Sequence, residues 1–296
     1  NGKKLAVKIQ YPGVANSIGS DLSIVKPVAV RMFNLKGQDV EKFFKEVENK
    51  LLEETDYELE LAQSRQMTEE CAGVPNLSFP KYYPEWSNKR VLTMDWMEGI
   101  HLSEYTDQEN TDPQINQMLG QSLWDFYMFQ MHCLKKVHAD PHPGNFLISP
   151  RHELVALDFG CIKQIPEDFY QPYFELSKEE NLNNPSKFQE ILRSLEILTP
   201  TDTPEEITFF TDLFNRMLRL LTLPFHADTF DFSDAVFWNQ IASLSQEFTE
   251  DKEWRKMNGN RGSEHFIYIN RTFFGLYSLL FDLKAKVTIN NYMNFV

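Results

Sequence analysis

The sequence predicts an α+β protein with two lobes, a small mixed lobe over residues 1–97 and a larger, mainly helical lobe over residues 98–296. Alternating apolar and polar residues, typical of strands, are concentrated in the first third of the chain. Helical spacing of apolar residues dominates the remainder. A length of 296 residues fits one large or two small domains.

Three elements are expected in the small lobe. Lys4–Gln10 alternates as a strand does, and Tyr11-Pro12-Gly13 ends it. A helix is predicted from Asp39 to Leu51, continuing through the acidic stretch 51–62 (LLEETDYELELA). Arg90–Gly99 (RVLTMDWMEG) is predicted to be a strand and its exit toward the second lobe.

The large lobe is expected to begin with a long helix and a hairpin. The helix covers Pro113–Val137, and two short apolar segments with polar, turn-forming centres follow it (HADPHPGNFLI and LVALDFGCI). Further helices are predicted over Asp168–Leu176, Pro185–Leu198, Pro204–Leu223 and Arg271–Val287.

Composition excludes several classes of function. Against 29 basic residues stand 43 acidic ones, a net charge of −14, which argues against a nucleic-acid partner and against a polybasic membrane patch. The three cysteines are far apart, so a reducing, cytoplasmic location is expected. Phe273–Phe281 is only nine residues long, whereas about 20 apolar residues span a bilayer. No transmembrane segment is therefore expected, and peripheral association with a membrane stays open.

The strongest motif combines Asp140, Asn145 and Asp158 in that order. Phosphoryl transfer from ATP needs a carboxylate near the attacking hydroxyl group and hard oxygen ligands for Mg²⁺. In protein kinases an Asp of the catalytic loop has the first role, and an Asn five residues later and the Asp of Asp-Phe-Gly hold the metal. Asp140 is thus the predicted catalytic residue, and Asn145 and Asp158 are the predicted magnesium ligands.

A zinc site is the alternative at this loop. His138 and His142 are four residues apart, as in a helical pair of zinc ligands. Pro141 and Pro143 argue against a helix here, because proline lacks the N–H group and clashes with the preceding turn. His142 is instead expected to orient the loop.

Lys8 lies within an apolar strand pattern, as does the kinase lysine that contacts the α- and β-phosphates and pairs with a helical glutamate. Asp56 and Glu60, four residues apart on the predicted acidic helix, are candidate partners. The strand at Arg90–Gly99 would join two lobes around an adenine. Met94 would line the pocket, and the backbone of Asp95, Trp96 and Met97 would contact the base.

Together, the strings AVKIQYPG, LLEETDYELELA, RVLTMDWMEG, HADPHPGNF and LDFG resemble the UbiB/AarF family of atypical kinases, relatives of the mitochondrial coenzyme Q kinase-like proteins. The resemblance covers about residues 1–165 and implies a protein-kinase-like fold that binds ATP and Mg²⁺. It implies that Lys8 contacts phosphate, that Glu60 is its ion-pair partner and that Glu54 and Asp56 are the family's E-x-D pair. It also implies a role in isoprenoid-quinone lipid metabolism, with an isoprenoid lipid or small molecule as a further partner.

The departures from the family are informative. Its Lys-x-Gly-Gln extension and the Ala-rich nucleotide loop before the lysine strand are missing, so the N lobe is expected to be incomplete and the fragment's activity is in question. Ala139 replaces the Arg of most protein kinases, and no Ala-Pro-Glu segment follows Asp158 at a suitable distance. Both differences favour a small-molecule or lipid substrate, or ATPase activity, over general protein phosphorylation.

Two other functions stay open. Small-molecule phosphotransferases of the aminoglycoside or choline kinase type also carry a His-x-Asp-x-His-x-x-Asn loop. A pseudokinase that binds nucleotide without transfer is the second alternative, and ATP hydrolysis abolished by Asp140→Asn and Asp158→Asn would exclude it. The acceptor, the choice between kinase and ATPase, and the oligomeric state do not follow from the sequence.

Overall fold

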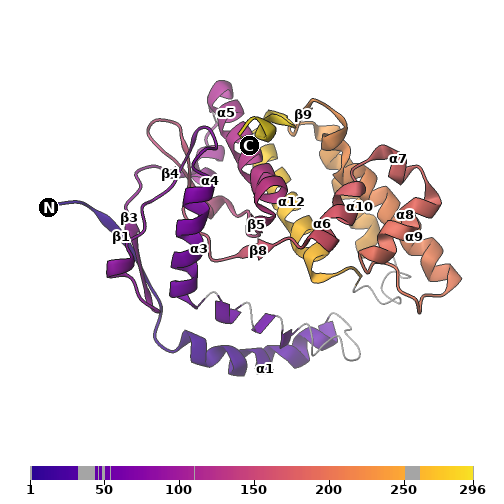
Figure 1. Ribbon diagram of the computed structural model, residues 1–296, viewed down its shortest axis with the longest axis horizontal. Helices are drawn as coiled ribbons and strands as arrows, with labels where there is room; N and C mark the ends of the chain where they lie inside the picture. Colours follow the sequence, from indigo (N-terminus) through magenta and orange to yellow (C-terminus); the bar gives the residue numbers. More distant parts are fainter. Residues whose placement is uncertain are drawn as a thin grey trace. The chain divides into compact units, whose positions relative to one another are not determined.

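The computed structural model describes residues 2–32, 44–45, 47–48, 51–53, 55–109, 111–250 and 261–295. The fold is α+β, as predicted (Figure 1). Two compact units are formed. Unit 1 consists of Asn1–Ala72, Ser78–Glu98 and Val155–Ile162, and unit 2 consists of Gly73–Leu77, Gly99–Leu154 and Lys163–Val296. Each unit combines segments that are distant in sequence, and the predicted division between residues 97 and 98 stays a prediction.

The sheet of unit 1 pairs β1 (Leu5–Ile9) with β3 (Val91–Asp95) in antiparallel register, so that Lys8 lies opposite Leu92. Both predicted strands are therefore present. Helix α3 (Tyr57–Glu70) packs beside β3 (Figure 1). Tyr57, Tyr82 and Leu92 are buried together between helix and sheet, each with its apolar surface removed from water.

Helix α1 (Val14–Met32) was not predicted from the sequence. Gly13 begins it at φ 88°, a left-handed conformation that glycine adopts without strain, and the Gly13 carbonyl accepts the N–H groups of Asn16 and Ser17. Pro27 inside the helix and a largely exposed surface obscured the pattern. Most of the helix predicted from Asp39 to Leu51 lies outside the described residues.

The predicted hairpin is confirmed as β6 (Phe146–Ile148) and β7 (Leu154–Ala156). These strands lie in a four-stranded sheet of order β2-β7-β6-β4, in which β2 is Leu77–Ser78 and β4 is Ile100–His101. A second ladder pairs β5 (Lys136–His138) with β8 (Ile162–Gln164).

The long helix α5 ends earlier than predicted. It covers Pro113–Phe129 and continues as a π-helical turn, η2 (Gln130–Leu134). Lys135 then adopts φ 52°, which stops the helix, and the predicted last residues belong to β5. The amide of buried Gln130 explains this ending: its Nε2 donates to Phe126 O, and its Oε1 accepts the His138 N–H at 2.8 Å.

Four of the remaining helices, α6, α8, α9 and α12, cover predicted regions with shifted ends, and α12 begins before Arg271 and ends before Val287. Helices α4, α7 and α10 were not predicted. The helices are α4 (Leu102–Thr106), α6 (Glu167–Glu175), α7 (Glu179–Leu182), α8 (Pro185–Ser194), α9 (Pro204–Leu221), α10 (Ala235–Glu250) and α12 (Glu264–Asp282). Short 3₁₀ turns occur at Pro84–Trp86, Pro143–Asn145 (η3), Leu223–His226 and Asn291–Phe295 (η5).

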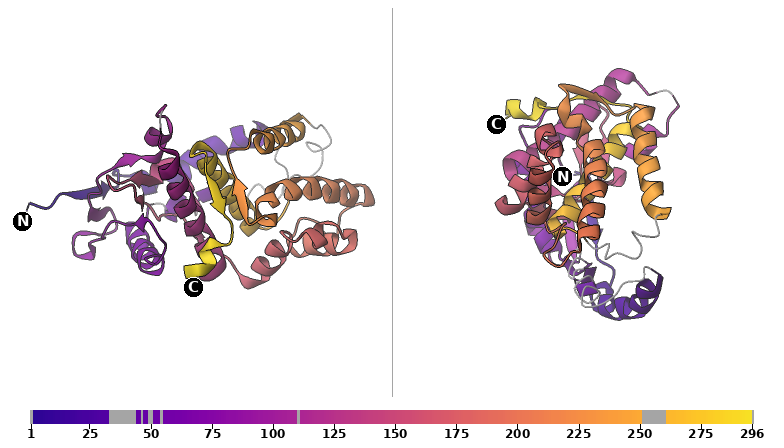
Figure 2. Two further views of the ribbon diagram at one scale, coloured as in Figure 1. Left: turned by 90° about the horizontal axis from the view of Figure 1, so that it is seen from above. Right: turned by 90° about the vertical axis from the view of Figure 1, so that its right-hand side faces the viewer.

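Helices α5 and α12 lie side by side in the core of unit 2, and the C-terminal segment crosses α5 (Figure 2). This segment contains β10 (Lys286–Thr288), paired with β9 (Thr229–Asp231). The Trp124 indole donates to Ile289 O at 2.8 Å, and Asn291 Nδ2 donates to Asp125 Oδ2 at 2.6 Å. Burial raises the pKa of Asp125 to about 6, although the bonds from Asn291 and Gln121 act in the opposite direction.

Candidate active site

Lys8 of β1 forms an ion pair with Glu60 of α3. Its Nζ lies 2.8 and 2.9 Å from the two carboxylate oxygens of Glu60 and 3.2 Å from Asp158 Oδ2, all within unit 1. The Glu60 side chain is 4% exposed and that of Lys8 is 34% exposed. Burial by itself lowers the pKa of Lys8, but the charges and hydrogen bonds of Asp158 and Glu60 outweigh it and raise that pKa above its ordinary value. Lys8 is therefore a fixed, permanently charged ammonium.

Two contacts orient the helix that carries Glu60. Asp56 is its N-cap, since Oδ1 accepts the N–H groups of Glu58 and Leu59 at 3.1 and 3.2 Å. Gln10, two residues after Lys8, donates from Nε2 to Thr55 O at 2.7 Å. Lys8 of β1 thus contacts the buried glutamate of α3, and Gln10, just after β1, contacts the segment that leads into the helix. Glu54, the other predicted member of the E-x-D pair, lies outside the described residues.

Asp158 is fixed by its own turn. Its Oδ1 accepts the Gly160 N–H at 2.8 Å, and Tyr82 donates its hydroxyl to the carbonyl of Leu157 at 2.8 Å. Phe159 is fully buried and packs against Phe79 with ring centroids 5.9 Å apart. The Asp-Phe-Gly triplet therefore has a buried ring as its anchor and directs its carboxylate toward Lys8.

Met94 and Asp95, two of the predicted hinge residues, are the last residues of β3, and Trp96 and Met97 follow the strand. Met94 packs on the Tyr57–Tyr82–Leu92 core, opposite Ala6. The Asp95 carboxylate forms an ion pair with Lys3, whose Nζ lies 2.6 Å from Asp95 Oδ1. Burial by itself raises the pKa of Asp95, but the hydrogen bonds and charge of its partners, chiefly Lys3, outweigh burial and lower that pKa. Trp96 is 48% exposed, with Lys4 Nζ 3.7 Å from its ring centroid, and Met97 is half-buried. An adenine contact of Met94, Asp95, Trp96 and Met97 stays a prediction.

The loop of unit 2 that contains Asp140 is closed by local hydrogen bonds. Asn145 Nδ2 donates to both Asp140 O (3.0 Å) and Asp140 Oδ2 (3.1 Å). His142 is extended and caps η3, its Nδ1 accepting the Gly144 N–H at 3.0 Å. This capping role agrees with the expectation that His142 orients the loop.

The sequence analysis missed two residues of α12 that contact this loop. Arg271 Nη2 lies 3.2 Å from Asp140 Oδ1. One turn later, a Cβ on Gly275 would overlap Pro141 Cγ and lie 3.1 Å from Pro141 Cβ. The glycine is thus needed for close packing of helix against loop. A glycine inside an apolar helical run was the one available signal.

The donor atoms suit a hard divalent cation. Asn145 Nδ2 donates to Asp140, and among the described residues none donates a hydrogen bond to Asn145 Oδ1, which is therefore open to a ligand. Asp158, the other predicted ligand, adds carboxylate oxygens in unit 1. Amide and carboxylate oxygens are the ligands that Mg²⁺ prefers, so each half of the predicted set fits this ion chemically.

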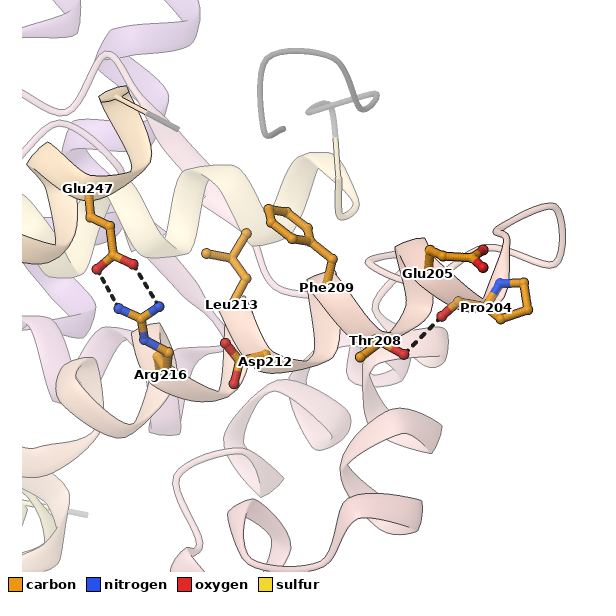
Figure 3. A pocket seen from close by; sticks show the side chains of 8 residues that line it. All are labelled: Pro204, Glu205, Thr208, Phe209, Asp212, Leu213, Arg216 and Glu247. Carbon is orange, nitrogen blue, oxygen red and sulfur yellow. Dashed lines mark hydrogen bonds and ion pairs between the residues drawn. The ribbon is translucent and has the colours of Figure 1, made fainter. Parts of the chain in front are cut away.

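A groove in the described part of the chain lies elsewhere, in unit 2 along α9 and α10 (Figure 3). Its volume is about 640 Å³. Phe209 and Leu213 line it, and Arg216 forms a two-bond ion pair with Glu247 across it. No residue predicted for catalysis lines this groove.

Comparison with known proteins identifies the family. The sequence model of the family described as the ABC1 atypical kinase-like domain matches residues 1–192 of the 296 in this chain. The chain belongs to the ABC1 atypical kinase-like family. The resemblance to UbiB/AarF kinases read from the motifs is thereby confirmed. Lys8, Glu60, Asp140, Asn145 and Asp158 all fall inside the matched region, whereas Arg271 and Gly275 lie outside it.

Relatives of the ABC1 family carry kinase names. The mitochondrial atypical kinase COQ8B of Danio rerio is 28% identical over 82% of this chain and 38% of its own length. COQ8 of Saccharomyces cerevisiae, also mitochondrial, is 27% identical over 81% of the chain and 48% of its length. A chloroplastic aarF domain-containing protein kinase of Arabidopsis thaliana is 29% identical over 72% of the chain and 30% of its length. The chain spans less than half the length of these relatives.

A solved structure shares the ABC1-family fold. Rv3197 of Mycobacterium tuberculosis, described in complex with erythromycin, superposes with a TM-score of 0.71 at 22% identity, covering 99% of this chain and 71% of that one. The agreement shows the fold. Among the described helices of the present chain, none combines the length and apolar character needed to cross a bilayer.

Proposed function

We propose that the chain binds Mg-ATP and acts as a kinase or ATPase in isoprenoid-quinone lipid metabolism. The observation that carries this proposal is the Lys8–Glu60 ion pair with Asp158 beside it. Active protein kinases require this strand lysine, this helical glutamate and the Asp of Asp-Phe-Gly together. A merely structural ion pair does not need a third, half-exposed carboxylate on the same ammonium.

Each residue then has one task. Lys8 binds the α- and β-phosphates, and Glu60 keeps its ammonium in place. Asp140 accepts the proton of the attacking hydroxyl or water. Asn145 and Asp158 hold Mg²⁺, which when bound neutralises charge on the phosphates and raises the electrophilicity of the γ-phosphorus. The backbone of residues 95–97 contacts the adenine.

The substrate class follows from what surrounds the catalytic aspartate. Ala139 is buried and offers no arginine for a phosphorylated activation loop, and no Ala-Pro-Glu segment follows the metal-binding aspartate. Both differences from protein kinases support a small-molecule or lipid acceptor, or hydrolysis. Relatives named COQ8, which are mitochondrial, support the quinone-lipid assignment and an organellar setting.

Nucleotide binding and hydrolysis test the proposal together. Calorimetry should show Mg-dependent ATP binding by the wild type. Asp158→Asn should abolish this dependence, whereas Asp140→Asn should keep binding but lose at least ~100-fold in ATP turnover. Asp212→Asn on the exposed face of α9 is the matched control and should behave as wild type.

Other outcomes would replace the proposal. Full Mg-ATP binding by Asp158→Asn contradicts the metal assignment. Binding without turnover by the wild type indicates a nucleotide-sensing pseudokinase. Transfer to choline or an aminoglycoside, with no stimulation by vesicles that contain a polyprenylated phenol, favours a small-molecule phosphotransferase.

A further inference from the structure

We propose that Arg271 of α12 is the positioning residue of the catalytic loop and holds the Asp140 carboxylate in its reactive orientation. This inference rests on the proposed function. It begins with a lack of cations in the loop: residues 137–150 contain no Lys or Arg. Within the described part of the chain, the guanidinium that contacts Asp140 comes from a residue 131 positions later, on α12.

Arg271 and Asn145 each contact a different oxygen of the Asp140 carboxylate. Arg271 Nη2 lies 3.2 Å from Oδ1, and Asn145 Nδ2 donates to Oδ2 at 3.1 Å. A carboxylate with a donor on each oxygen cannot rotate about its terminal torsion without losing a bond, so its plane is set. Each oxygen keeps a lone pair for the proton of a substrate hydroxyl.

The backbone beneath this contact is fixed as well. Gly275, four residues after Arg271 and therefore on the same helix face, packs directly on Pro141. On its other side α12 buries Thr272, Leu276 and Leu280 in the core of unit 2. Arg271 therefore extends from a rigid helix, which a positioning residue requires.

Energetics separate positioning from stabilisation. The Arg271 side chain is 65% exposed and that of Asp140 is 42% exposed, and exposed ion pairs contribute little to folding. Loss of Arg271 should hence leave the melting temperature nearly unchanged. A misplaced catalytic group, in contrast, can reduce turnover by roughly 100-fold. A role in orientation therefore predicts a kinetic defect without a folding defect.

Steady-state ATP turnover of three variants tests the inference. Arg271→Gln should lower kcat roughly 10- to 100-fold with KM for Mg-ATP unchanged. Arg271→Lys should recover most of kcat, because a single N–H contact to one oxygen can be made by an ammonium. Arg216→Gln is the matched control, since it removes an exposed Arg–carboxylate pair of the same unit away from the loop, and it should behave as wild type.

Hydrogen exchange gives a second readout that needs no activity. The amides of His142, Gly144 and Asn145 are bonded within the loop and should exchange faster in Arg271→Gln than in Arg216→Gln. An active wild type with unchanged kcat and exchange in Arg271→Gln overturns the inference alone. A wild type that neither binds nor hydrolyses ATP overturns the proposed function instead, and the exchange comparison still decides whether Arg271 holds the loop.

Discussion

Asp125→Asn should remove a pH dependence of stability that the buried carboxyl imposes. Asp125 is 2% exposed on α5, and burial raises its pKa to about 6. Since the unfolded value is about 3.9, the folded state keeps the proton to higher pH. The stabilisation from this group is thus complete below about pH 4 and is lost as the pH rises through 6.

The size of the effect follows from the two pKa values. Linkage gives a loss of about 2 kcal/mol between pH 4.5 and pH 7 from this one group. Urea unfolding followed by tryptophan fluorescence gives the free energy of unfolding of wild type and of Asp125→Asn at several pH values. The contributions of other titrating groups cancel when the value for Asp125→Asn is subtracted from that for wild type. This difference in unfolding free energy should decrease as the pH rises.

Asn291→Ala provides the companion variant. The Asn291 bond lowers the pKa of Asp125, so its removal should raise that pKa further and steepen the loss with pH. A difference between wild type and Asp125→Asn that is flat over this range would refute the reasoning.

Three further predictions concern the two units. Glu60→Gln should destabilise the protein by about 1–3 kcal/mol in urea unfolding, because it removes the buried partner of the strand lysine; equal midpoints would contradict this. Gly275→Ala should cost about 1–3 kcal/mol through overlap with the loop proline, whereas Ser278→Ala on the exposed side of α12 should not; equal effects would exclude close packing as the cause. Burial, and after it the charge of Lys135, lowers the pKa of His132 to about 4. Because the unfolded state takes up the proton first, the free energy of unfolding of the wild type should fall by about 2 kcal/mol from pH 7 to pH 5. His132→Phe keeps the aromatic packing and should not show that loss; parallel pH curves would argue against a neutral buried imidazole.

The sequence could predict what depends on local pattern. Lys8 on an alternating strand and Glu60 on an acidic helix were expected to pair across 52 residues, and their side chains are in contact. The hairpin between Asn145 and Asp158 followed from two apolar triplets. These features are encoded in periodicity and in turn residues, which a single sequence displays.

The missed features depend on tertiary contact. Arg271 looks like an ordinary exposed residue of a helix, and only the fold brings it to Asp140. Gln10 belongs to a recognised string, but its bond to Thr55 O is not a matter of spacing. The end of α5 at Phe129 was missed because Gln130 competes for backbone groups from inside the core.

The contact between α12 and the Asp140 loop also sets an order of events during synthesis. The helix is made 131 residues after the loop, which at about 5–20 residues per second is a delay on the order of 10 s. Through that interval Trp124 lacks its partner at Ile289, and the face of α5 that α12 will cover is open to water or to a chaperone. Residues 1–192 contain Asp140, Asn145 and Asp158, but Asp140 gains its contact with Arg271 only after α12 has emerged.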